Sequence, residues 1–144
     1  MGLFGNLANR VRRRPTPVKP KQVLRLVYEP RHDGDADPGE VVWTWVPYEE
    51  DPKQGKDRPV LVIGFFGTAL AVLPLTSKDH TDRPDCVELG SGAWDASGRP
   101  SYVKLDRLLK VDHGRVRREG ATLDRERFDE VVRAFKDYTA AGGR

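Results

Sequence analysis

Two short apolar segments joined by a charged loop constrain the fold more than any other part of this 144-residue chain. The segments, residues 41–46 and 60–63, are rich in β-branched and aromatic residues, which favour strands. The residues between them include Pro, Gly and many charged side chains, which cannot be buried in a sheet. The region 39–64 is therefore predicted to form a strand, an exposed loop and a second strand. Arg58 lies where the loop enters the second strand, a place that can direct a permanent positive charge at a ligand phosphate.

Three further segments are also predicted to be strands: the apolar run 69–76, the short segment 86–89, and residues 101–111, where apolar residues alternate imperfectly with charged ones as in a half-exposed strand. A turn at residues 113–114 then leads into 115–118, which continues the β pattern. Because no helical pattern separates these runs, the strands indicate an antiparallel barrel or a highly curved sheet.

A helix is predicted at the C-terminal end of the chain. Asp124 can cap its start, and Leu123 and Phe128 stand where a hydrophobic staple would place them. Gly142 and Gly143 end the helical pattern. One apolar stripe runs along the helix and is interpreted as a core-facing surface, not a functional site; it consists of Phe128, Val131, Val132, Phe135 and Tyr138.

The N-terminal residues differ in composition from the rest. The chain has a net charge of +3, but residues 1–22 carry six Lys or Arg and no acid, so the remainder carries −3. Pro and Arg dominate residues 10–21, a composition that cannot build a core. We therefore expect a basic, flexible extension over residues 1–38, a domain over 39–139 and a flexible tail over 140–144. Within the extension, the alternating pattern at 23–28 can add an edge strand.

The cellular compartment can also be inferred. Cys86 is the only cysteine, which excludes an internal disulfide and suits a reducing cytosol. No run approaches the ~20 apolar residues of a membrane span, and the start of the chain lacks the pattern of a secretory signal. We expect a cytoplasmic protein without a membrane span.

Four blocks of this sequence, in order, resemble the PemK/MazF family of toxins from type II toxin–antitoxin systems. The family begins with a Gly-Asp-(apolar)₂-Trp strand, a loop and an Arg-Pro-(apolar)₄ strand, and residues 39–43 and 58–63 match these two strands, with Gln54 and Gly55 agreeing in the loop. Residues 72–77 and 101–112 are similar to the family's next strand and to the strand before its closing helix. The resemblance covers residues 39–138. It implies a mainly β protein with an SH3-like antiparallel barrel of the CcdB/PemK/MazF type, a C-terminal α-helix and a homodimeric assembly.

The activity that this resemblance implies is sequence-selective, metal-independent cleavage of single-stranded RNA, restrained by a small antitoxin protein. RNA carries its own nucleophile, the 2′-OH, so such an enzyme needs to orient it, stabilise charge on the phosphorane and manage two protons. By the resemblance, Arg58 is the catalytic arginine that stabilises the phosphoryl oxygens and assists proton transfer. Thr76 is the hydroxyl residue that hydrogen-bonds the same phosphate. A structural role stays open for each of these residues. Arg58 can instead form an ion pair with Asp57 or Glu50, and the Thr76 hydroxyl can instead bond to the backbone at the strand end.

Several loop side chains are expected to contact mRNA, because lysines can hold phosphates and an aromatic ring can stack on an unpaired base. Trp94 belongs to this set, although it can equally cover the open end of the barrel. Lys53 and Asp57 depart from the residues that family members often carry there, so base recognition can differ. The expected RNA-binding residues are Lys53, Gln54, Lys56, Ser77, Lys78, His80 and Trp94.

No metal or cofactor is expected. The three histidines lie far apart and form no zinc-binding spacing, the single cysteine has no partner, and no phosphate-cradling glycine loop is present. Two alternative functions remain at this point: a non-catalytic, protein-binding toxin of the CcdB type, which would not need Arg58, and an RNA-binding module that uses the basic N-terminal residues.

Overall fold

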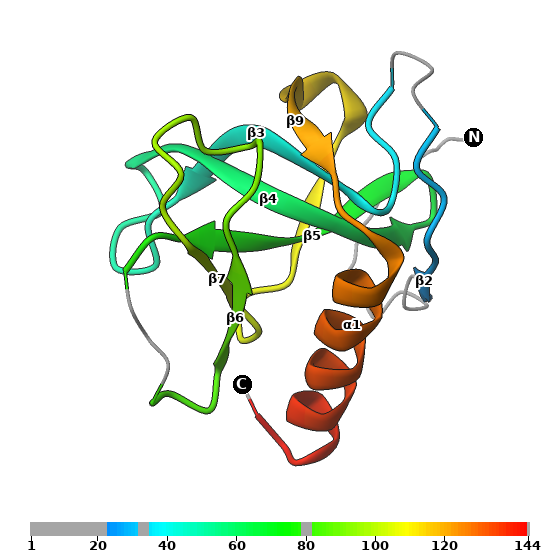
Figure 1. Ribbon diagram of the computed structural model, residues 1–144, viewed down its shortest axis with the longest axis vertical. Helices are drawn as coiled ribbons and strands as arrows, with labels where there is room; N and C mark the ends of the chain where they lie inside the picture. Colours follow the sequence, from blue (N-terminus) through cyan, green and yellow to red (C-terminus); the bar gives the residue numbers. More distant parts are fainter. Residues whose placement is uncertain (1–22, 32–34, 79–81, 144) are drawn as a thin grey trace, which may run out of the picture.

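The computed structural model describes residues 23–31, 35–78 and 82–143, and it is an antiparallel β structure closed by one C-terminal helix (Figure 1). The predicted fold class, mainly β with a C-terminal α-helix, is confirmed, and the curvature of the sheet is consistent with an SH3-like barrel. The strands are β2 (Leu24–Leu26), β3 (Glu40–Pro47), β4 (Gly55–Phe66), β5 (Ala69–Thr76), β6 (Cys86–Gly90), β7 (Ser101–Lys104), β8 (Leu109–Val111) and β9 (Val116–Thr122). A 3₁₀ turn (His113–Arg115) precedes β9, and helix α1 spans Arg125–Ala140.

The long strands β3, β4 and β5 form the centre of the sheet. The strand order is β6-β7-β5-β4-β3-β9, with β2 added to β4 and β8 added to β5, and every pairing is antiparallel. The register of β4 with β5 shifts between Val62 and Gly64, which marks a β-bulge. A bulge bends a strand and increases its twist, so β4 can serve both the central sheet and the pairing with β2.

Both faces of β4 are buried over residues 60–63. Successive side chains of a strand point to opposite faces, and Val60 and Val62 belong to one apolar cluster whereas Leu61 and Ile63 belong to another. The second cluster also holds residues of α1, so the helix covers that face of the sheet. Burial on both faces explains why residues 60–63 read as an unbroken apolar run instead of an alternating one.

Helix α1 follows the sequence prediction closely. The Asp124 side chain accepts a hydrogen bond from the Arg127 backbone N–H (3.0 Å), which caps the helix start. Phe128, Val131 and Phe135 are buried, in agreement with the predicted apolar stripe. The backbone N–H of Gly143 donates to the Tyr138 carbonyl (3.0 Å), so the helix ends at the predicted glycines.

The packed domain begins before residue 39. The edge strand expected within 23–28 is present as β2, and Tyr28 donates its hydroxyl hydrogen to the Leu123 carbonyl (2.7 Å) and packs against Phe128, with ring centroids 5.0 Å apart. A side chain at Gly64 would lie 2.0 Å from the Arg25 carbonyl oxygen, so glycine is needed there for β2 to approach. The expected boundary at residue 39 is therefore too late for the segment from Leu24 onward. The basic residues 1–22 lie outside the described part of the chain.

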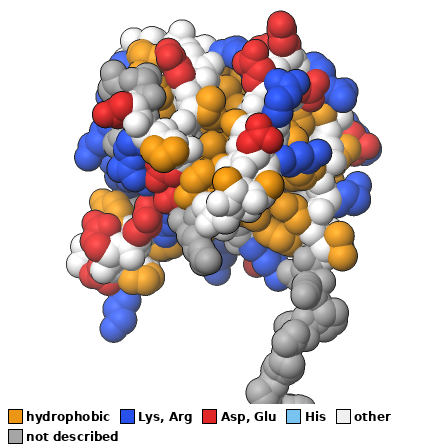
Figure 2. Space-filling model, turned by 90° about the horizontal axis from the view of Figure 1, so that it is seen from below, with side chains coloured by type: hydrophobic (Ala, Val, Ile, Leu, Met, Phe, Trp, Pro, Cys, Tyr) orange, Lys and Arg blue, Asp and Glu red, His pale blue; other side chains and the backbone are white. Residues whose placement is uncertain are grey.

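The surface of the domain mixes both signs of charge. On the face shown in Figure 2, Lys and Arg side chains lie among Asp and Glu side chains, with apolar groups between them. This face therefore presents no uniform basic patch to a polyanion. Among the described residues, no helix has the length and apolar character needed to cross a membrane.

Candidate functional site

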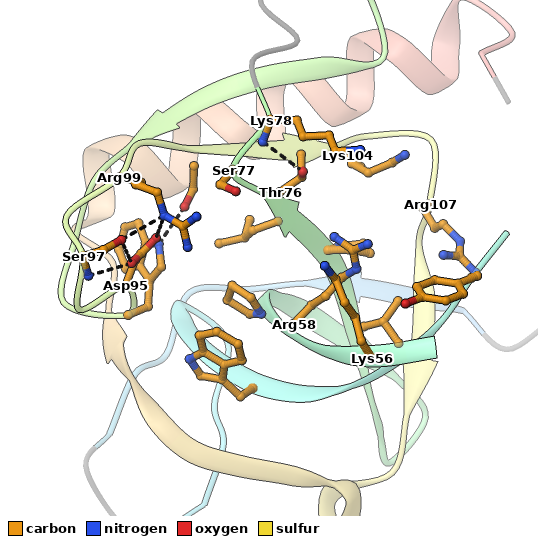
Figure 3. Close-up of a pocket in the computed structure, with 18 of the residues that line it drawn as sticks. Lys56, Arg58, Thr76, Ser77, Lys78, Asp95, Ser97, Arg99, Lys104 and Arg107 are labelled. Atoms are coloured by element: carbon orange, nitrogen blue, oxygen red, sulfur yellow. Dashed lines mark hydrogen bonds and ion pairs between the residues drawn. The ribbon is translucent and has the colours of Figure 1, made fainter. Parts of the chain in front are cut away.

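A cavity of ≈ 1030 Å³ lies where the end of β3, the start of β4 and the end of β5 meet (Figure 3). The loop between β6 and β7 and residues of and after β7 complete its wall. Its volume is at the upper end of the range of about 300–1,000 Å³ that is typical of ligand pockets. Seven cationic side chains and three carboxylates line it, so it suits a polyanion; the cations are Lys56, Arg58, Lys78, Arg99, Lys104, Arg107 and Arg117, and the acids are Glu49, Glu50 and Asp95.

The strand register brings Arg58 and Thr76 together. Val60 of β4 and Pro74 of β5 are the last pair of these two strands, and Arg58 and Thr76 are each two residues beyond that pair. On its other side Arg58 is paired with Thr44, which is buried and donates its hydroxyl hydrogen to the Arg115 carbonyl (2.8 Å). The backbone of Arg58 is therefore held by its pairing with β3, and its side chain and that of Thr76 lie in the same cavity (Figure 3).

Arg58 is half-buried, and within the residues that the structure describes its side chain makes no hydrogen bond or ion pair. The ion pairs with Asp57 and Glu50 that the sequence left open are both absent from this part of the chain. Asp57 instead accepts a hydrogen bond from Arg117 (Nη1 to Oδ2, 2.7 Å), because adjacent residues of a strand point to opposite faces. The guanidinium of Arg58 thus keeps its full set of donors for a ligand, in a partly desolvated position where charge interactions are stronger than in water.

The Thr76 hydroxyl accepts one local hydrogen bond, and its hydrogen has no acceptor among the described residues. Its oxygen accepts a hydrogen bond from the Lys78 backbone N–H (3.2 Å), as the backbone-capping interpretation expected. A hydroxyl accepts through its oxygen and still donates through its hydrogen. Thr76 can therefore be held in place by the backbone of Lys78 and donate to a ligand oxygen at the same time.

The remaining cations of the cavity differ in how far they are engaged. Lys104 pairs with Glu49 (2.9 Å), and this hydrogen bond holds the pKa of the Glu49 carboxyl below its usual value. Arg107 donates to the Pro47 carbonyl (2.7 Å), and Arg99 contacts Asp95 (3.3 Å). In the described part of the chain, the side chains of Lys56 and Lys78 have no such partner, and both are exposed.

The cavity contains some of the residues expected to bind RNA and leaves out others. Lys56, Ser77, Lys78 and Trp94 line it. Lys53 and Gln54 do not, because their loop folds back on itself, with the Tyr48 N–H donating to the Gln54 carbonyl (2.8 Å). His80 lies outside the described residues.

Trp94 does not have the exposed position that the base-stacking prediction requires. Its side chain is only 3% exposed, and its indole N–H donates to the Ser101 hydroxyl (2.9 Å). The Arg127 guanidinium lies 5.7 Å from the ring centroid, and Gly92 leaves room for the ring because a side chain there would lie 2.1 Å from it. The ring belongs to the hydrophobic core and forms part of the cavity wall.

Four cations of the lining were not singled out in the sequence: Arg99, Lys104, Arg107 and Arg117. Lys104 and Arg107 lie in residues 101–112, the fourth block of similarity to the family. Their positive charges within that block could have marked them as candidate site residues. Arg99 and Arg117 line the cavity because of tertiary packing, which no local sequence pattern predicts. The described residues include no group of three or more His, Cys, Asp or Glu side chains placed to hold a metal ion.

Fold and site together define a small antiparallel β domain, closed by a helix, with an arginine and a threonine that line one cationic cavity. The family described as PemK-like, MazF-like toxin of type II toxin–antitoxin systems matches residues 37–139, and the chain belongs to this family. Among solved structures it is similar to MazE–MazF from Deinococcus radiodurans (crystal form III), with 22% identity and a TM-score of 0.52 over 76% of this chain and 98% of that chain. This likeness concerns the fold. No curated protein sequence matches the chain significantly.

Proposed function

We propose that this protein is a metal-independent, sequence-selective endoribonuclease toxin that cleaves single-stranded mRNA. The observation that carries the proposal is the placement of Arg58, which is half-buried, has no side-chain partner among the described residues and lines the same cavity as Thr76. Family membership over residues 37–139 supports the same activity.

The proposed reaction is an attack of the RNA 2′-oxygen on the adjacent phosphorus. The new P–O2′ bond forms as the P–O5′ bond breaks, the 2′-OH loses its proton and the leaving 5′-oxygen gains one. The products are a 2′,3′-cyclic phosphate and a 5′-hydroxyl. Charge accumulates on the non-bridging phosphoryl oxygens in the transition state, and donors fixed in advance at that place lower the barrier.

Arg58 and Thr76 would supply these donors. A guanidinium is planar and always charged, and it can donate two parallel hydrogen bonds to phosphate oxygens. In this proposal Arg58 stabilises the phosphoryl charge and assists proton transfer to the leaving oxygen, while the Thr76 hydroxyl donates to the same phosphate. Lys56 and Lys78, with Ser77, would hold flanking phosphates at the cavity rim.

The partners follow from the same proposal. The fold neighbour was solved as a MazE–MazF complex, and we propose that a small antitoxin likewise restrains this protein. An acidic segment of such an antitoxin would complement the cations of the cavity. We also propose that the protein works as a cytoplasmic homodimer, the form that the family resemblance implies.

The test is cleavage of single-stranded RNA by the purified protein in excess EDTA. We expect defined cuts, each leaving a 2′,3′-cyclic phosphate and a 5′-hydroxyl, with a duplex of the same sequence left intact as the matched control. Cleavage that requires added magnesium or manganese would contradict the metal-independent mechanism. A product with a 5′-phosphate would contradict attack by the 2′-hydroxyl.

A further inference from the structure

Trp45 stands apart from the other large apolar side chains of the domain. It is 49% exposed, and among the described residues only Val23 shares this degree of exposure for a large apolar side chain. Trp45 lies near the end of β3, where it is paired with Asp57 of β4, one residue beyond the last pair of β3 with β9, so the ring projects from a paired strand and not from a loop. An indole on a rigid strand loses little conformational freedom when it binds a ligand.

One side of the Trp45 ring lies against backbone, and the other side is open to solvent. Gly55, on the neighbouring strand, would bring a Cβ within 2.7 Å of Trp45 Cζ2 if it carried a side chain. The indole therefore lies over the bare backbone of Gly55, close to the point where the loop between β3 and β4 joins β4. Backbone supports the ring from beneath, while about half of the side chain faces solvent.

Trp45 does not line the cavity itself but lies beside the part of it that Trp43 and Arg117 line, on the sheet face that also carries Asp57 and that is opposite to the face of Arg58. Side chains two residues apart on a strand share a face at about 6.8 Å spacing, so Trp43, which lines the cavity, lies on the same face as Trp45. Trp43 is in register with Arg117, which also lines the cavity, and Trp45 is in register with Asp57. The Arg117–Asp57 ion pair (2.7 Å) offsets the negative charge beside the ring.

We propose that Trp45 is a base-stacking subsite for single-stranded RNA, placed to hold an unpaired base of the strand as it leaves the cavity. This inference rests on the proposed function. An aromatic face accepts any base and adds affinity next to a groove that holds phosphates. Trp45 is in register with Asp57, and Trp43 is in register with Pro59 and Arg117, so charged groups of both signs lie beside the exposed ring. The centre of a protein–protein interface is depleted of charged residues.

The experiment compares Trp45→Ala and Trp45→Phe with the wild-type protein. The probe is an RNA that spans a mapped cleavage site and carries a 2′-O-methyl group at the cut nucleotide, so that it binds without being cleaved. We expect the alanine variant to bind about 5- to 150-fold more weakly, the range for loss of one stacked base, and the phenylalanine variant to keep most of the affinity. Binding should also quench tryptophan fluorescence in the wild type and quench it less in Trp45→Phe.

Two controls separate this inference from other outcomes. Val23→Ala removes the other exposed apolar side chain and should leave RNA affinity unchanged, and the melting temperature of Trp45→Ala should stay close to that of the wild type. If the wild type cuts RNA but Trp45→Ala binds as tightly, the subsite is refuted and the proposed function stands. If the wild type neither cuts nor binds RNA, both are refuted. If Trp45→Ala changes the oligomeric state but not RNA affinity, the ring is a protein contact and the subsite is refuted.

Discussion

Replacing Arg58 by alanine should abolish most RNA cleavage while leaving the fold intact. The guanidinium has no partner in the described part of the chain, so its removal leaves no carboxylate unpaired and takes away donors that are free for the transition state. Loss of one pre-placed donor to a developing oxyanion costs about 2.7–4 kcal/mol, which lowers the rate about 100- to 1,000-fold. Arg58→Lys keeps the charge but not the planar fork, so it should restore little of the rate.

The stability of this variant should hardly change. The backbone at residue 58 is held by pairing with Thr44, whose buried hydroxyl bonds to Arg115 independently of the arginine side chain. A surface substitution of this kind alters the free energy of unfolding by about 0.5 kcal/mol or less, which corresponds to about 2 °C or less in melting temperature. Arg133→Ala, at an exposed helix position, is the matched control for loss of one arginine.

The assay is single-turnover cleavage of a labelled RNA in EDTA, with the melting temperature measured on the same preparations. A folded Arg58→Ala variant that cuts at the wild-type rate would refute the catalytic assignment. If that variant also inhibited growth like the wild type, a non-catalytic, protein-binding toxin of the CcdB type would explain the protein better. Slow cleavage by Arg133→Ala would show instead that total positive charge, not the position of Arg58, sets the rate.

Two further predictions concern side chains in the same cavity. Thr76→Val should lower the cleavage rate about 10- to 150-fold, because a hydrogen bond to a charged group contributes about 1.5–3 kcal/mol. Thr76→Ser keeps the hydroxyl and should retain most of the rate. Equal rates for the two variants would contradict the role of the hydroxyl. The hydrogen bond from Lys104 lowers the pKa of Glu49 in the folded state, so the ion pair stabilises the fold fully above the ordinary value of 4.5 and the contribution disappears as pH falls through the lowered pKa. The effect should be small because Glu49 is half exposed, and melting curves from pH 7 to about 3 should show a slightly steeper acid loss for the wild type than for Glu49→Gln.

The sequence predicted those strands and that helix for which the local residue pattern matches the burial of the element in the folded domain. Residues 60–63 were recognised as a strand from β-branched composition, and the structure buries them on both faces of the sheet. The helix was recognised from its cap at Asp124, its apolar stripe and its terminal glycines, each a feature of residues close together in the chain. The choice of Arg58 and Thr76 rested on the family resemblance, and the pairing of β4 with β5 brings both into the lining of one cavity.

The sequence could not predict which loop residues face the cavity. Trp94 lies between glycines and small residues, a setting typical of an exposed loop, but its indole fills space in a core made by α1, β7 and the central sheet. Gln54 and Lys53 belong to a loop that closes on its own backbone, and the direction of such a loop depends on hydrogen bonds between its ends. Leu24 likewise became part of the domain through pairing with a strand some forty residues later in the chain.

The cations of the cavity divide into two groups, and this division determines where an incoming phosphate should bind. One group is bound to acceptors of the protein itself, and a phosphate must displace those acceptors before it gains the same hydrogen bonds; it comprises Arg99, Lys104, Arg107 and Arg117. The other group, Lys56, Arg58 and Lys78, has no side-chain partner within the described residues. Binding to this second group requires only the removal of water. Within this group, Arg58 alone offers a planar pair of donors. The phosphate site that requires no displacement of protein acceptors therefore includes the side chain whose geometry suits the transition state.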